Sequence, residues 1–98
     1  MKNWYDHSTD ELCRALLCLD SMEECYAFLE DICTIKEILG MSQRLEVAQM
    51  LRSGDSYATI TKATGASTAT INRVSKCCEY GTGGYRTVID RLKEEKGT

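Results

Sequence analysis

The chain has 98 residues, a net charge of −3, no proline and six cysteines. This length favours one domain, so we expect a single helical domain over residues 1–98 whose small core is completed by a partner subunit. Without proline, helices can be ended only by the seven glycines and by Ser, Thr or Asp caps. The composition therefore predicts an all-α protein and disfavours short strands and turns.

The sequence predicts a cytoplasmic protein that does not enter a membrane. No basic stretch followed by an apolar run opens it, and its apolar runs fall far short of the roughly 18 residues that span a bilayer. Thiols in that compartment stay reduced. The sequence contains no C-x2-C pair, and His7 lies far from any spacing typical of metal ligands. We therefore expect no metal and place the cysteines among small core residues, with a redox response of one or two as the alternative. They are Cys13, Cys18, Cys25, Cys33, Cys77 and Cys78.

Three helix starts share one capping pattern, in which a hydroxyl and a carboxylate three residues later satisfy each other's backbone amides. Apolar residues recur at helical spacing after each start. The third pattern keeps its phase through Gly40, so it predicts one long helix that ends near residues 53–54. The three pairs are Ser8 and Glu11, Ser21 and Glu24, and Thr34 and Glu37.

Three shorter helices follow. Ser56 is expected to cap a helix over residues 57–64, and Gly65 to end it. Ser67 is expected to cap a second helix over 68–80, and a last helix is predicted over 85–95.

The segment 57–78 has the pattern of a helix-turn-helix, two short helices that meet across a glycine turn. Gly65 can adopt the positive φ that such a turn requires. Ile60, Ile71 and Val74 are spaced to pack the two helices together. The alternative is a pair of surface helices around a glycine.

Charge supports DNA binding by this segment. Residues 1–31 carry eight acidic against two basic residues, whereas residues 52–76 carry four basic residues against one acidic. On the outer face of the second helix, Asn72 can bond adenine, while Ala69 or a threonine methyl can contact thymine. Lys62 and Lys76 suit phosphates. The predicted contacts to double-stranded DNA are Lys62, Ser67, Thr68, Ala69, Asn72, Arg73 and Lys76.

The stretch 64–73, Thr-Gly-Ala-Ser-Thr-Ala-Thr-Ile-Asn-Arg, resembles the helix-turn-helix of the Trp repressor family. The runs 43–48 and 80–85 are most similar to its YerC/YecD-like branch, and the resemblance covers about residues 32–95. It implies a six-helix fold and an intertwined homodimer. The helix-turn-helix of each subunit, called its reading head below, is expected to bind one half of a pseudo-palindromic DNA site.

The resemblance also implies a corepressor pocket. Two arginines line that pocket in the family, and their positions correspond to Arg44 and Arg73 in this sequence. The alternatives are an ion pair of Arg44 with Glu37 or Glu46, and a phosphate contact for Arg73. The possible pocket residues are Thr34, Arg44, Thr70, Arg73, Val74 and Cys77.

Two pocket positions depart from the family. Val74 stands where the family has a glycine that leaves room for the indole ring, and Cys77 stands where it has a serine. Added volume in a packed slot costs about 1–3 kcal/mol, so tryptophan is predicted to bind weakly or not at all. No cofactor is predicted. The sequence leaves open whether a small-molecule effector of another kind binds.

These features favour a transcriptional regulator over an enzyme. The glycine loop at 81–84 lacks the Lys-Ser/Thr of a phosphate-binding loop, and adjacent carboxylates such as Glu23 and Glu24 share a solvated face. Two alternatives stay open, a protein-interaction module and a replication-initiator-like module.

Overall fold

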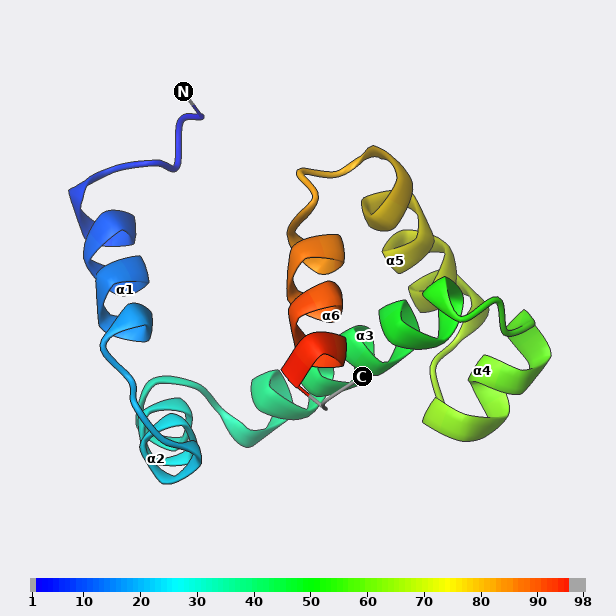
Figure 1. The fold of residues 1–98 in the computed structure, drawn as a ribbon, viewed down its shortest axis with the longest axis horizontal. Helices are drawn as coiled ribbons and strands as arrows, with labels where there is room; N and C mark the ends of the chain where they lie inside the picture. Colours follow the sequence, from blue (N-terminus) through cyan, green and yellow to red (C-terminus); the bar gives the residue numbers. More distant parts are fainter. Residues whose placement is uncertain (1, 96–98) are drawn as a thin grey trace. The chain divides into compact units, whose positions relative to one another are not determined.

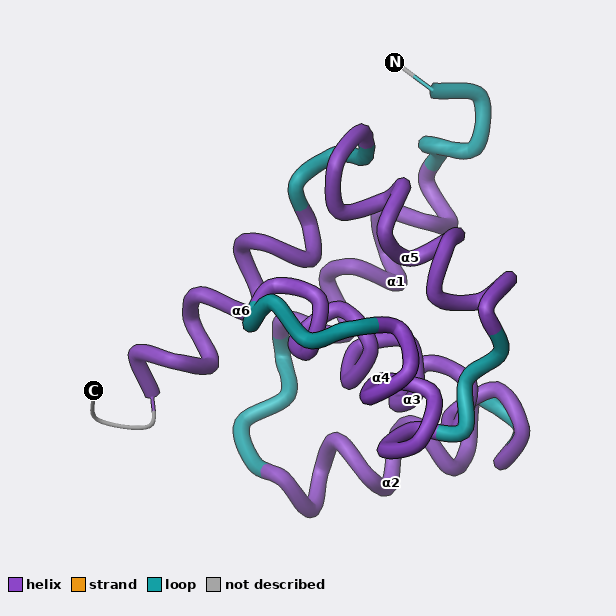
Figure 2. The backbone as a smooth tube through the Cα atoms, turned by 90° about the vertical axis from the view of Figure 1, so that its right-hand side faces the viewer, coloured by secondary structure: helices purple, strands orange, loops and turns teal. Residues whose placement is uncertain are grey.

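The computed structural model describes residues 2–95, which form six helices joined by short loops (Figures 1 and 2). No strand occurs between residues 2 and 95, so the predicted six-helix, all-α fold is confirmed. Within this part of the chain, no helix combines the length and the hydropathy that a membrane crossing requires. The helices are α1 (His7–Leu17), α2 (Met22–Ile32), α3 (Ile35–Arg52), α4 (Tyr57–Thr64), α5 (Thr68–Tyr80) and α6 (Gly84–Glu95).

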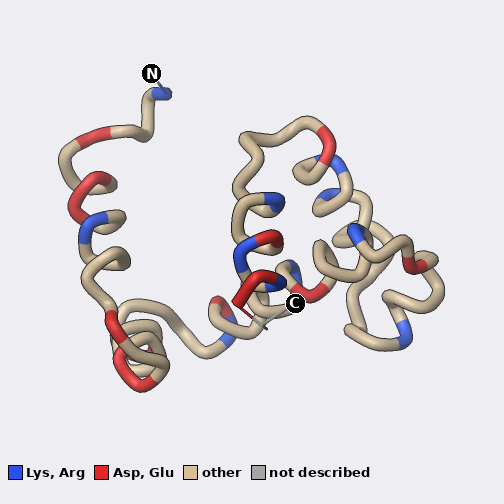
Figure 3. The backbone as a smooth tube through the Cα atoms, in the orientation of Figure 1, with Lys and Arg blue, Asp and Glu red and all other residues tan. Residues whose placement is uncertain are grey.

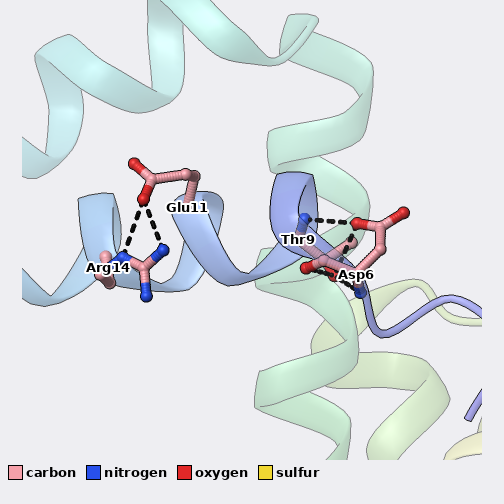
Figure 4. A network of polar contacts seen from close by, with 4 residues as sticks. All are labelled: Asp6, Thr9, Glu11 and Arg14. Carbon is pink, nitrogen blue, oxygen red and sulfur yellow. Dashed lines mark hydrogen bonds and ion pairs between the residues drawn. The ribbon is translucent and has the colours of Figure 1, made fainter.

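The start of α1 differs from the predicted one. Asp6 accepts a hydrogen bond of 2.9 Å from the Thr9 amide, and the Thr9 hydroxyl oxygen accepts one of 2.9 Å from the Asp6 amide (Figure 4). The predicted box of Ser8 and Glu11 is wrong, because Ser8 lies inside the helix and Glu11 pairs with Arg14. A carboxylate is a strong acceptor for free helix amides, and the Thr9 amide lowers the pKa of Asp6.

The next two helices begin at the predicted residues, with one box incomplete. Ser21 accepts from the Glu24 amide at 3.1 Å, but the Glu24 carboxylate accepts from the Asp20 amide at 2.7 Å instead of from that of Ser21. The box before α3 is complete, with bonds of 3.1 Å from the Glu37 amide to Thr34 and 2.8 Å from the Thr34 amide to Glu37. The bond from the Thr34 amide lowers the pKa of Glu37.

The chain divides into two compact units, Met1–Ile38 and Leu39–Thr98. Within residues 2–38, no side chain is buried. Helices of 11 residues are marginal in water without tertiary packing, so the first unit requires another surface to cover it. The single domain expected over residues 1–98 stays a prediction. Large apolar side chains exposed in this unit include Leu12, Leu16, Leu17, Met22, Tyr26 and Ile32.

The second unit has a core to which α3, α4, α5 and α6 all contribute. Two side-chain bonds link α3 to other helices of this unit: Arg52 pairs with Asp90 of α6 at 2.7 Å, and the Gln43 side-chain amide donates to the Thr64 carbonyl of α4 at 3.2 Å. The long helix predicted through Gly40 is confirmed, and it carries both of these links. The buried residues, none more than 1% exposed, are Val47, Ala48, Ile60, Ala66, Ile71, Val74 and Ile89.

The predicted burial of the cysteines is wrong for the single chain. All six are free thiols; Cys13, Cys18 and Cys77 are exposed and the others are half-buried. The core is filled instead by isoleucine, valine and alanine side chains of the second unit. Partial burial raises the pKa of Cys78, which disfavours its thiolate.

Candidate nucleic-acid interface

The turn between α4 and α5 is built as the sequence predicts. Gly65 ends α4 in the left-handed region at φ +75°. Next to it, the Thr64 hydroxyl donates to the Ile60 carbonyl at 2.8 Å and accepts from the Ala66 amide at 3.1 Å. The second of these bonds gives the Ala66 amide, which lies beyond the end of α4, a hydrogen-bond partner.

Both helices begin at the serines predicted to cap them. Ser56 accepts from the Thr59 amide at 3.2 Å, and Ser67 accepts from the Thr70 amide at 3.2 Å. The two short helices predicted on either side of Gly65 are therefore present, with α5 extending to Tyr80, and their assignment as a helix-turn-helix over residues 57–78 stays a prediction.

Replacing Gly65 by alanine should lower the free energy of unfolding by about 1–2 kcal/mol, since a Cβ is strained at positive φ. A Cβ at this position would have no atom within 4 Å, so the loss reflects backbone strain and not a clash. Gly65→Asn is the matched control and should lose less, because asparagine tolerates this conformation. Denaturant unfolding measures both, and an alanine variant as stable as the parent would contradict the assignment.

The second helix of the motif has a buried and an exposed side. Ile71 and Val74 face the core, as predicted, together with Ile60 of α4. No acidic residue occurs from 56 to 78, and Figure 3 shows basic positions on α4 and α5, whereas acidic positions recur along α1 and α2. All seven predicted DNA contacts are exposed, namely Lys62, Ser67, Thr68, Ala69, Asn72, Arg73 and Lys76. Their role in binding stays a prediction.

The sequence did not predict a role for one exposed residue of α4, Tyr57. The Tyr57 hydroxyl, at the start of α4, donates a hydrogen bond of 3.0 Å to Oδ1 of Asn72 in α5. The two residues are 15 positions apart, so neither helical periodicity nor a capping pattern connects them. Only the crossing of the two helices brings them together.

Four of the possible pocket residues lie on α5, and they do not share one environment. Arg73 and Cys77 are exposed, Thr70 is half-buried, and Val74 is 1% exposed within the core. The Val74 side chain therefore fills core volume. A pocket role for these residues stays a prediction.

Arg44 of α3 is exposed, and its guanidinium lies 3.5 Å from the point where a Cβ on Gly40 would stand. It forms no ion pair with Glu46 within the described second unit. Thr34 lies in the first unit and is engaged in the box with Glu37. An open apolar pocket of about 550 Å³ in the second unit includes Cys77 but neither arginine; it is lined by Leu45, Cys77, Gly81, Thr82, Gly84, Tyr85 and Val88.

Comparison with known proteins gives consistent matches over most of the chain. The chain is 53% identical over 85 residues to the uncharacterized protein YerC of Bacillus subtilis (strain 168), covering 87% of this chain and 82% of YerC. A candidate Trp repressor from Staphylococcus aureus superimposes with a TM-score of 0.87 at 46% identity, over 90% of this chain and 88% of that one. A TrpR-like protein from Eubacterium eligens ATCC 27750 gives 0.88 at 48% identity, over 91% and 92%. The predicted similarity to the YerC-like branch is confirmed.

The family model of the Trp repressor protein matches residues 7–93, which include all six helices apart from the last two residues of α6. This family consists of DNA-binding regulators and not of enzymes. With this match over most of its length and its similarity to solved structures of this type, the chain belongs to the Trp repressor family.

Proposed function

We propose that the protein is a sequence-specific transcriptional regulator of the repressor type, which acts in the cytoplasm on double-stranded DNA as a homodimer. α5 enters the major groove while α4 crosses the sugar-phosphate backbone. This docking is common to helix-turn-helix proteins, the Trp repressor among them. Two reading heads in one dimer address two half-sites about one helical turn apart.

The observation that carries the proposal is the exposed side of α4 and of α5 up to residue 78, which carries basic residues and no acidic ones. Lys62, Arg73 and Lys76 lie on it, and the same two helices bury Ile60 and Ile71 on their other side. A rigid core behind a basic face is what DNA reading requires, since local potential and not net charge attracts phosphates. The acidic residues of 1–31 lie outside this motif.

Selection of bound sequences from a random DNA library tests the proposal, followed by titration of the selected site at several salt concentrations. We expect a two-fold related motif whose affinity falls steeply as salt rises, because phosphate contacts release counterions. Binding that is insensitive to salt, or a library without enrichment, would favour a protein-interaction module.

Asn72→Ala should weaken binding to the selected site by about 1–3 kcal/mol and relax the preference at one base of each half-site. Lys62→Ala and Lys76→Ala are the controls, and each should weaken all sequences alike, since a lysine–phosphate contact carries no base information. Quantitative binding to a panel of single-base variants distinguishes the two effects. An unchanged preference in Asn72→Ala would show that another face of α5 reads the bases.

We further propose that DNA binding needs no tryptophan. Val74 is packed in the core beneath the reading face. Its methyl groups supply apolar contacts that a corepressor would otherwise make, so the reading head is held in place without a ligand.

A further inference from the structure

The hydrogen bond from Tyr57 to Asn72 joins the two helices of the helix-turn-helix on its exposed side. Among residues 2–95, it is the one bond between side chains that links α4 to α5. Tyr57 is 39% exposed and Asn72 is exposed as well, so both can reach a docked molecule. No packing requirement explains the bond, because the helices are already held by the buried Ile60 and Ile71.

The bond distinguishes the two ends of the Asn72 amide. A phenol O–H donating to Oδ1 holds that oxygen toward α4 and leaves both hydrogens of the NH2 group free. Reading adenine requires both ends in a fixed order, with Oδ1 accepting from N6 and the NH2 group donating to N7. Oδ1 has two lone pairs, so it can accept from Tyr57 and from adenine together.

The same bond limits what Tyr57 can do to DNA directly. Its one proton is donated to Asn72, so the hydroxyl turns only lone pairs toward an approaching phosphate, which also carries only acceptors. Tyr57 is therefore poorly suited to the general, sequence-independent attraction that Lys62 and Lys76 provide.

We propose that Tyr57 is a positioning residue for base recognition, which orients the Asn72 amide for adenine. The proposal rests on the function proposed above. In the free protein, water competes for this exposed bond and the amide can rotate. Docking against DNA excludes that water, so the bond then determines which end of the amide meets the base.

Tyr57→Phe tests the proposal, because it removes one exposed oxygen and keeps the ring. At the base position assigned to Asn72, the preference for the selected base should fall about three- to tenfold, as expected for the loss of one hydrogen bond. Affinity for unrelated DNA should not change, and neither should the melting temperature beyond a few degrees. Tyr80→Phe, at a tyrosine 82% exposed at the end of α5, is the matched control and should leave the preference intact.

A double variant separates positioning from direct contact. In an Asn72→Ala background, Tyr57→Phe should cause no further change in base preference, since the group it orients is gone. Additive effects, or a uniform loss over all sequences, would overturn the positioning role and leave the DNA-binding function standing. If the parent protein itself enriched no sequence, the proposed function and this inference would both be overturned.

Discussion

At micromolar concentration, the folded protein should sediment as a dimer of about 22 kDa, twice the 11.0 kDa of one chain. The physical reason is the first unit, in which α1 and α2 bury no side chain although they carry many large apolar ones. Ordering two such helices is unfavourable unless a second copy covers them. The melting temperature should therefore rise with protein concentration. A folded 11 kDa species with a concentration-independent melting temperature would contradict the prediction.

A pair of substitutions in α1 locates the covering contact. Leu12 and Leu16 are one helical turn apart on the same side, so replacing both with serine removes two neighbouring apolar side chains. If the partner buries them, the dimer should lose about 3 kcal/mol or more, measured by sedimentation equilibrium. Glu11→Gln is the control: it breaks the exposed pair with Arg14 (Figure 4), which contributes at most about 1 kcal/mol. Equal losses in both variants would place the interface elsewhere.

Most helix boundaries could be predicted because caps act over three residues. Ser56 and Ser67 accept from the amides of Thr59 and Thr70, three positions on, so the sequence alone is sufficient to find them. The turn at Gly65 was predictable for the same reason, since only local backbone geometry is involved. α1 was harder because two capping patterns overlap there.

The site was predictable only in part, because contacts between helices depend on how those helices cross. The outward side of α5 followed from periodicity, and Asn72 lies on it. The bond from Tyr57 could not be inferred, since no rule relates residues 15 apart on two helices. Cysteine burial was mispredicted because an apolar position on a helix is buried only where another element covers it.

Val74→Gly should lower the free energy of unfolding by about 3 kcal/mol, combining the loss of a buried side chain with the poor helix propensity of glycine. Val74 is 1% exposed and packs in the core with Ile60 and Ile71. Chemical denaturation measures this loss. Val47→Ala, at a buried valine of α3, is the control for core packing in another helix. A glycine variant as stable as the parent would show that Val74 contributes no packing.

Calorimetric titration with tryptophan then tests whether the Val74 side chain fills the space in which the corepressor of the family would bind. The parent should bind tryptophan weakly or not at all, since any ring in that slot must displace the Val74 methyl groups from a close-packed core. The glycine variant removes them, and Arg73, which is predicted to line the pocket, can then pair with a planar carboxylate through two parallel bonds. Binding by Val74→Gly, with none by the parent or by Val47→Ala, would indicate that valine substitutes for the corepressor.

Because a ligand that binds only the folded state stabilises it, tryptophan should also restore part of the lost melting temperature in Val74→Gly alone. Micromolar affinity in the parent would instead mean that the protein rearranges around Val74, and DNA binding would then depend on a ligand after all.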